Sequence, residues 1–290
     1  MPIIRYPCSN IFVALIHLCS RYIFEDDKRE RILKIHKLIL SYVLGLLGSA
    51  LMADNHELIG GLNPSEPFAL NVSHCNLKPG KTMNQVDKLV GDYIDWSKKN
   101  NVETTIIRGT PFYTHRNDGS DPPYDFTTFE VADYETMGKN WDAVMSTKSG
   151  QKLFDTYSDI VQCDDKFATV YPQWTDVERL NVDRSRITLW NWCTAKPGVS
   201  VEQLQDRHAS AVNPQQDSIG WFVVVPRIGG ANAPGKFAHV MVYPDVSSVM
   251  SYQKRLTDGG WERMRDYYAS YANCSGHSAT MEEVLHMPGL

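Results

Sequence analysis

The sequence lacks the short motifs that mark the common metal centres and nucleophiles. It contains no Cys-x-x-Cys pair, no His-x-x-x-His pair and no Gly-x-Ser-x-Gly, which are patterns of zinc ligands and of a serine nucleophile on a strand-to-helix turn. It also lacks an excess of basic residues, since 29 Lys and Arg stand against 34 Asp and Glu, for a net charge of -5. These absences argue against a metal site and against a nucleic-acid partner, which needs a basic stripe.

One segment, Gly230–Lys236, matches the Gly-x-x-x-x-Gly-Lys pattern of phosphate-binding loops. The next residue is Phe237, where that pattern requires Ser or Thr to hold magnesium, and a strand-like run follows in place of a helix. Without a helix N-terminus, no set of backbone N–H groups converges on a phosphate. We therefore interpret the segment as a β-hairpin loop and expect no cofactor.

Residues 1–53 differ in character from the rest of the chain. The run Leu38–Met52 carries no charge and follows a basic segment. A basic segment, an apolar run and small residues at its end are the pattern of a signal peptide, here with cleavage after Ala53 or Ala50. The alternative is a transmembrane anchor, but the run is shorter than the ~20 residues that span a bilayer. We interpret 1–27 as an upstream extension of the reading frame. We expect an exported protein, periplasmic or secreted, with no stable membrane anchor after cleavage.

The six cysteines fit export. Cys8 and Cys19 lie in the leader, and the mature chain would keep Cys75, Cys163, Cys193 and Cys274. An even number of cysteines in an exported chain suggests disulfides, for which three connectivities are possible. A metal site and free thiols are the alternatives.

The chain contains an internal repeat. Cys-x-x-Lys-Pro-Gly occurs at 75–80 and again at 193–198, and each copy is followed by a Ser/Thr-x-x-Gln pattern, at Thr82–Gln85 and Ser200–Gln203. That pattern is a capping box, in which a hydroxyl and a Gln side chain bond the first free N–H groups of a helix. Two copies with matching cysteine, turn and cap indicate a duplication.

Hydrophobic periodicity gives each repeat the order β-α-β-β-α-β, which is a ferredoxin-like unit. The expected organisation is a linker at 54–67, repeat 1 at 68–174, a charged linker at 175–185, and repeat 2 with a C-terminal tail at 186–290. In each repeat the second helix breaks, near Ser149-Gly150 and at Asp258–Gly260. For Ser275–Leu290 we expect at most one weak strand or a helical turn.

The strand order of a ferredoxin-like unit is 4-1-3-2, so its first and fourth strands are neighbours. The end of strand 1 then lies close to the start of strand 4. This geometry selects one connectivity, Cys75–Cys163 and Cys193–Cys274.

Each repeat leaves one sheet face uncovered by its helices, and packing sheet on sheet would bury both faces. The resulting α+β architecture, two tandem ferredoxin-like repeats, resembles the dimeric α/β-barrel superfamily, which includes antibiotic-biosynthesis monooxygenase-like, EthD-like and NIPSNAP-like families. The resemblance covers roughly 66–285. It implies a cavity between the sheets that holds a small, partly apolar molecule, which some members oxidise without metal or flavin.

The candidate site residues are polar or aromatic groups in predicted strands and helices, mostly where the repeats differ. As catalytic candidates we take His239 and His74, which would move a proton, and Arg108 and Arg227, which would stabilise an anion. As ligand-binding candidates we take Trp190, Trp192, Asn191, Asn71, Glu130 and His208. The alternatives are hydrogen-bonded core histidines, aromatic core packing, and an Arg108–Glu130 ion pair on neighbouring strands.

Two functions follow from these residues. The first is an exported protein that binds a small, partly apolar molecule between its sheets, as a cofactor-independent monooxygenase-like or isomerase-like enzyme. The second is a non-catalytic periplasmic binding or stress-associated protein whose barrel interior is filled.

Overall fold

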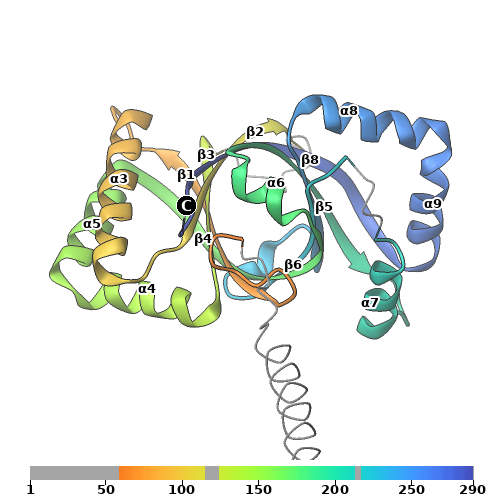
Figure 1. Ribbon diagram of the computed structural model, residues 1–290, viewed down its shortest axis with the longest axis horizontal. Helices are drawn as coiled ribbons and strands as arrows, with labels where there is room; N and C mark the ends of the chain where they lie inside the picture. The colour runs from red at the N-terminus through yellow and green to blue at the C-terminus, as the bar shows by residue number, and fades with distance from the viewer. Residues whose placement is uncertain (1–58, 115–123, 213–216, 290) are drawn as a thin grey trace, which may run out of the picture. The chain divides into compact units, whose positions relative to one another are not determined.

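The computed structural model describes residues 59–114, 124–212 and 217–289, and Figure 1 draws their arrangement. Residues 56–290 form one compact unit. The predicted leader, 1–53, lies outside the described residues. Within the described part, no helix is long and apolar enough to cross a membrane.

The first repeat builds a four-stranded sheet with three helices. Its elements are β1 (Phe68–Leu77), α3 (Met83–Asn100), β2 (Thr105–Tyr113), β3 (Phe126–Ala132), α4 (Tyr134–Ser146), α5 (Lys148–Ile160) and β4 (Val161–Thr175). The strands lie in the order β4-β1-β3-β2. Helix α3 begins with the predicted capping box, Thr82 with Gln85. The predicted helix break falls at Thr147, whose hydroxyl accepts a hydrogen bond from Gly150 N.

The second repeat follows after the short helix α6 (Val177–Val182), inside the predicted linker. Its elements are β5 (Ser185–Ala195), α7 (Val201–Ala209), β6 (Gly220–Pro226), η1 (Gly230–Asn232), β7 (Phe237–Tyr243), α8 (Val246–Arg255), η2 (Leu256–Gly260), α9 (Trp261–Ser270) and β8 (Ala272–His286). The strand order β8-β5-β7-β6 repeats that of the first half. The predicted break is the η2 segment, where Gly259 has a φ of 105°, a conformation that favours glycine.

The two sheets close into one barrel. Strand β2 pairs with β8 and β4 pairs with β6, both antiparallel, so the eight strands form a closed ring. Figure 1 shows α3, α4 and α5 on one side of the barrel and α7, α8 and α9 on the opposite side. The predicted fold class is confirmed: two tandem ferredoxin-like repeats form a dimeric α/β barrel within one chain.

The prediction for Ser275–Leu290 is wrong. These residues belong mainly to β8, a 15-residue strand that pairs with β5 on one side and β2 on the other. Polar residues such as Ser278, Thr280 and Glu282 alternate along it, and their face lines the barrel rather than a solid apolar core. The apolar alternation that identifies a strand is therefore missing.

Both predicted disulfides are present. Cys75 is bonded to Cys163 and Cys193 to Cys274, with Cα–Cα distances of 4.1 Å. Each pair consists of directly opposed residues on the first and fourth strands of its repeat. The strand order derived from the repeat therefore selected the correct connectivity.

Most strands bury both of their faces over much of their length, although the outward face of β8 is exposed at Met281 and Glu283. One face points into the barrel, where the main apolar cluster includes Leu70, Val72, Phe129, Val170 and Val240. The other face packs beneath the helices, as Cys75 and Phe126 do against Val86 and Leu89 of α3. One end of the barrel is covered by Leu62 and Met287. Toward the other end, the barrel interior contains a cavity.

Candidate functional site

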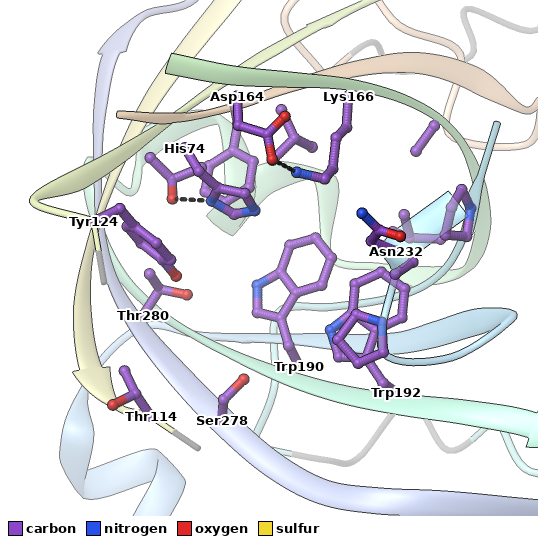
Figure 2. A pocket seen from close by; sticks show the side chains of 18 of the residues that line it. His74, Thr114, Tyr124, Asp164, Lys166, Trp190, Trp192, Asn232, Ser278 and Thr280 are labelled. Carbon is purple, nitrogen blue, oxygen red and sulfur yellow. Dashed lines mark hydrogen bonds and ion pairs between the residues drawn. The ribbon is translucent and has the colours of Figure 1, made fainter. Parts of the chain in front are cut away.

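The barrel interior holds a cavity of about 420 Å³ between the two sheets (Figure 2). Its apolar wall comes from Val72, Phe129, Trp190, Trp192 and Val224. Its polar groups are His74, Thr127, Asp164, Lys166, Asn232, Ser278 and Thr280. A cavity of this size, mostly apolar and with a few converging polar groups, is typical of a small-molecule site.

His74 is the histidine that enters this cavity. It shares a face of β1 with Val72, and its Nδ1 lies 2.9 Å from Thr127 Oγ1. The ring stacks on Tyr124 with 4.6 Å between centroids. Burial, with a smaller contribution from the positive charge of Lys166, lowers the pKa of His74 to about 4, against a still smaller opposite effect of Asp164. The imidazole is therefore neutral at physiological pH, and among the described residues its Nε2 has no hydrogen-bond partner.

Two tryptophans on the inward face of β5 form an aromatic wall. The rings of Trp190 and Trp192 are stacked, with centroids 6.0 Å apart. Trp190 also stacks on Phe129 at 5.7 Å. Figure 2 shows both indoles beside the cavity. Stacked rings of this kind offer a flat face on which another aromatic ring can pack.

Lys166 supplies positive charge to the cavity. On β4 its side chain points into the barrel, as that of Ala168 does. It forms an ion pair with Asp164, which also lines the cavity. Its side chain is only 21% exposed. An anionic group bound beside His74 would therefore meet a partly buried ammonium, which is screened less than a surface charge.

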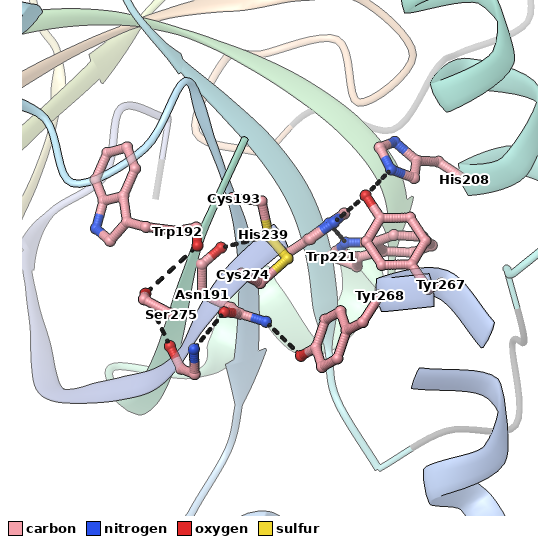
Figure 3. Close-up of a disulfide and its surroundings, with 11 residues drawn as sticks. Asn191, Trp192, Cys193, His208, Trp221, His239, Tyr267, Tyr268, Cys274 and Ser275 are labelled. Atoms are coloured by element: carbon pink, nitrogen blue, oxygen red, sulfur yellow. Dashed lines mark hydrogen bonds between the residues drawn. A yellow bond between two sulfur atoms is a disulfide. The ribbon is translucent and has the colours of Figure 1, made fainter. Parts of the chain in front are cut away.

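His239 and His208 lie elsewhere, on the helix-covered side of the second sheet (Figure 3). Tyr267 OH lies 3.0 Å from His239 Nε2 and 3.0 Å from His208 Nε2, and Trp221 Nε1 donates to His239 Nδ1 at 3.3 Å. Burial lowers the pKa of His239 to about 3 and that of His208 to about 4. Both histidines are thus neutral members of a hydrogen-bonded core network.

Asn191 also faces away from the barrel interior. Its amide donates to Tyr268 OH at 3.0 Å and its carbonyl accepts from Gly276 N at 3.1 Å. These contacts tie β5 to α9 and β8. The structure therefore separates Asn191 from its neighbours Trp190 and Trp192, which do line the cavity.

The two candidate arginines do not reach the cavity. Arg108 forms ion pairs with Asp87 of α3 and with Glu283 of β8, the latter at 2.6 Å. The expected Arg108–Glu130 pair is therefore wrong, because carboxylates on two other elements lie closer to the guanidinium. Arg227 follows β6 and donates to Tyr171 OH at 3.1 Å and to Thr169 Oγ1 at 3.3 Å.

Glu130 and Asn71 line a different hollow, of about 330 Å³, between the first sheet and α3–α5. Sequence reasoning missed Lys166, Thr127 and Thr280 as cavity residues. Lys166 and Thr127 follow the same alternation as His74 along their strands, and this alternation was the available signal. Thr280 lies on β8, which was not expected as a long strand. Among the described residues no group of three or more His, Cys, Asp or Glu is placed to hold a metal ion.

The comparisons with known proteins concern the fold. No protein-family model and no curated protein matches the sequence. Among solved structures, a candidate monooxygenase from Lactobacillus acidophilus is 9% identical, with a TM-score of 0.45 over 77% of this chain and 95% of that chain. A candidate monooxygenase from Fusobacterium nucleatum is 14% identical, with a TM-score of 0.44 over 76% and 93%. A haem complex of a DypB variant from Rhodococcus jostii is 10% identical, with a TM-score of 0.39 over 76% and 94%. At such identities the likeness does not extend to the chemistry of a site.

Proposed function

We propose that this chain binds a small, partly aromatic molecule in the barrel cavity. The observation that carries the proposal is an open cavity of about 420 Å³ between the sheets, with stacked tryptophans on one side and a neutral His74 on another. An aromatic ring would pack against Trp190 and Trp192. A hydroxyl or carbonyl on that ring would hydrogen-bond with His74 Nε2, and Lys166 would attract any negative charge that develops there.

Catalysis at this site would begin with proton transfer to His74. Neutral His74 is the form that accepts a proton, and Lys166 would stabilise the resulting substrate anion. In an isomerase-like reaction the proton returns to another atom of the same molecule. In a monooxygenase-like reaction a CH₂ group of the substrate becomes C=O. The substrate gives four electrons to O₂, one oxygen atom becomes the carbonyl oxygen, and the other leaves as water with the two hydrogens of the CH₂ group.

A second candidate is a non-catalytic binding protein. A histidine whose pKa lies near 4 is a weak base at neutral pH, and this observation favours binding without turnover. The two candidates differ in one measurement, the exchange of the acidic C1 hydrogens of 2-tetralone in D₂O followed by NMR. Faster exchange with the protein, abolished in His74→Ala, would indicate an enzyme. Equal rates with and without protein would indicate a binding protein.

Replacing His74 with alanine should weaken the binding of 2-naphthol about 5-fold, because one hydrogen bond contributes about 1 kcal/mol. The binding of naphthalene, which has no hydroxyl, should stay unchanged. Both affinities can be measured by the quenching of tryptophan fluorescence.

His239→Ala is the control for this prediction. It removes a buried, hydrogen-bonded imidazole on the other side of the sheet, so it should lower stability and leave naphthol binding intact. Loss of naphthol binding in folded His239→Ala, with full binding in His74→Ala, would move the site out of the barrel and contradict the proposal.

The protein is further proposed to be exported, to the periplasm or outside the cell. Two disulfides support this, because such bonds persist mainly in oxidising compartments. We expect N-terminal sequencing of the mature protein to begin after Ala53 or Ala50. A mature chain that begins before Leu51 would contradict the signal peptide.

A further inference from the structure

The hollow under the helices of the first repeat is separate from the barrel cavity. It is lined by the opposite face of the sheet, and its volume is about 330 Å³. Exposed residues such as Phe154 and Asp165 stand at its edge. It is therefore open to solvent on its own side of the sheet.

The floor of this hollow is polar and acidic. Asn71 is opposite Glu130 in the β1–β3 pair, and Ser73 is opposite Asp165 in the β1–β4 pair. Ser73 donates to Asp165 Oδ1 at 2.5 Å. The roof comes from the helices and is mostly apolar, through Leu89, Trp141, Val144, Leu153 and Phe154, with polar groups from Tyr93, Asn140 and Tyr157. Helices that cover a sheet usually meet apolar side chains, so a row of carboxylate and amide groups is unusual here.

In the second repeat, apolar and hydrogen-bonded side chains occupy the corresponding layer between the sheet and its helices. The cross-strand pair that corresponds to Asn71 and Glu130 is Leu189 and Met241, which are apolar. The next pair is Asn191 and His239, and these bond to tyrosines of α9. The polar groups of that half bond to tyrosines of α9, whereas those of the first half bond to one another and also line the hollow.

Hydrogen bonds link Glu130 to Asn71 and Tyr93, but none of the described residues that line the hollow carries a positive charge. Asn71 is only 8% exposed; its amide donates to Glu130 Oε2 at 3.5 Å, and its carbonyl oxygen accepts no hydrogen bond from any described residue. No Lys or Arg in the described part of the chain forms an ion pair with Glu130 or Asp165, since the neighbouring Lys166 pairs with Asp164 on the barrel side. Burial raises the pKa of Glu130, hydrogen bonds with Tyr93 and Asn71 oppose this, and the negative charge of Asp165 adds a smaller contribution in the raising direction.

We propose that this hollow is a second ligand site, which binds a small organic amine with its ammonium group against Glu130 and the Asn71 carbonyl and its apolar part beneath the helices. An ammonium donates several hydrogen bonds and carries the positive charge that the floor lacks. An aromatic or branched apolar group would pack against Trp141 and Phe154. The same hollow would disfavour an anion, because two carboxylates face it. This site is independent of the barrel cavity and of the function proposed for it.

The test uses the full mature protein and 2-phenylethylamine, with binding measured by calorimetry. The wild-type protein should bind the amine at least 10-fold more tightly than 2-phenylethanol, which has a similar shape and no charge. Glu130→Gln keeps the size of the side chain and removes its charge, so it should weaken amine binding at least 10-fold and leave the binding of the alcohol unchanged. Equal affinity for amine and alcohol, or an unchanged affinity for the amine in Glu130→Gln, would overturn the proposal.

A second variant distinguishes a loss of amine binding from a loss of folding. Asn71→Leu introduces the residue that the second repeat has at this position, Leu189, and should fold, as judged by circular dichroism, yet lose the preference for the amine. His74→Ala and saturating 2-naphthol act on the barrel cavity and should not change amine binding. Competition between naphthol and the amine would place both in the barrel and would also overturn the proposal.

Discussion

Replacing both cysteines of the Cys193–Cys274 pair with alanine is expected to lower the free energy of unfolding by about 4 kcal/mol. The bond joins residues 81 apart in sequence, and cross-linking a loop of this length removes much of the conformational entropy of the unfolded chain. The loss is a large fraction of the ~5–15 kcal/mol that stabilises a typical domain. Urea unfolding followed by circular dichroism measures it.

Chemical reduction is the control for this prediction. The reduced wild-type protein, with both disulfides open, should unfold at lower urea than the alanine double variant, in which Cys75–Cys163 remains closed. Four free thiols in the oxidised, denatured mature protein would contradict both disulfides. Unfolding curves that coincide with and without reductant would show that neither bond contributes to stability.

Replacing Glu282 with glutamine is expected to stabilise the protein at pH 8 by about 3 kcal/mol. Glu282 is 8% exposed, next to a small cavity at the covered end of the barrel, and is opposite Arg186 on β5. Burial raises its pKa to about 7, from 4.5, although the Arg186 charge lowers it. Between pH 4.5 and 7 the folded protein keeps a proton that the unfolded chain releases, so stability falls as the pH rises. The variant has no proton to lose, and its advantage should vanish near pH 4.5.

Glu283→Gln is a matched control, one residue further along β8. Its side chain is 58% exposed and pairs with Arg108 at the surface. A surface pair of this kind contributes about 1 kcal/mol or less, so this variant should not reproduce the pH-dependent gain. If the stability difference between wild type and Glu282→Gln were the same at pH 5 and pH 8, Glu282 would not be the group that titrates.

The fold was predictable because the same turn and helix-capping motifs occur twice in the chain. The two Cys-x-x-Lys-Pro-Gly turns with their capping boxes located strand 1 and helix 1 in each half, and the strand order then placed Cys163 and Cys274. Strand β8 was not predictable in the same way. Its inward residues Ser278, Thr280 and Glu282 line cavities, so the apolar alternation that reveals a strand is interrupted there.

The candidate site was predictable only in part, because both faces of the strands that carry it, β1, β5 and β7, are covered. Period-2 alternation shows that Trp190 and Trp192 share one face and Asn191 the other, but it does not say which face lines the barrel. In an ordinary two-layer sheet the polar face is solvated, and that rule would decide the question. Here helices cover one face and the opposite sheet covers the other. The sequence pattern therefore does not distinguish His74, which enters the barrel cavity, from His239, which lies beneath the helices.

Barrel closure has a consequence for how this chain is made. When synthesis has produced only the first repeat, β2 and β4 are edge strands with unpaired backbone groups, and the apolar face around Leu70 and Phe129 has nothing to cover it. Such edges and faces promote association with other chains. Both partners of these edges, β6 and β8, belong to the second repeat, and β8 is the last strand of the barrel. Pairing strands as distant in sequence as β2 and β8 is slow. The first repeat on its own should therefore aggregate, and the chain is expected to depend on chaperones until β8 is in place.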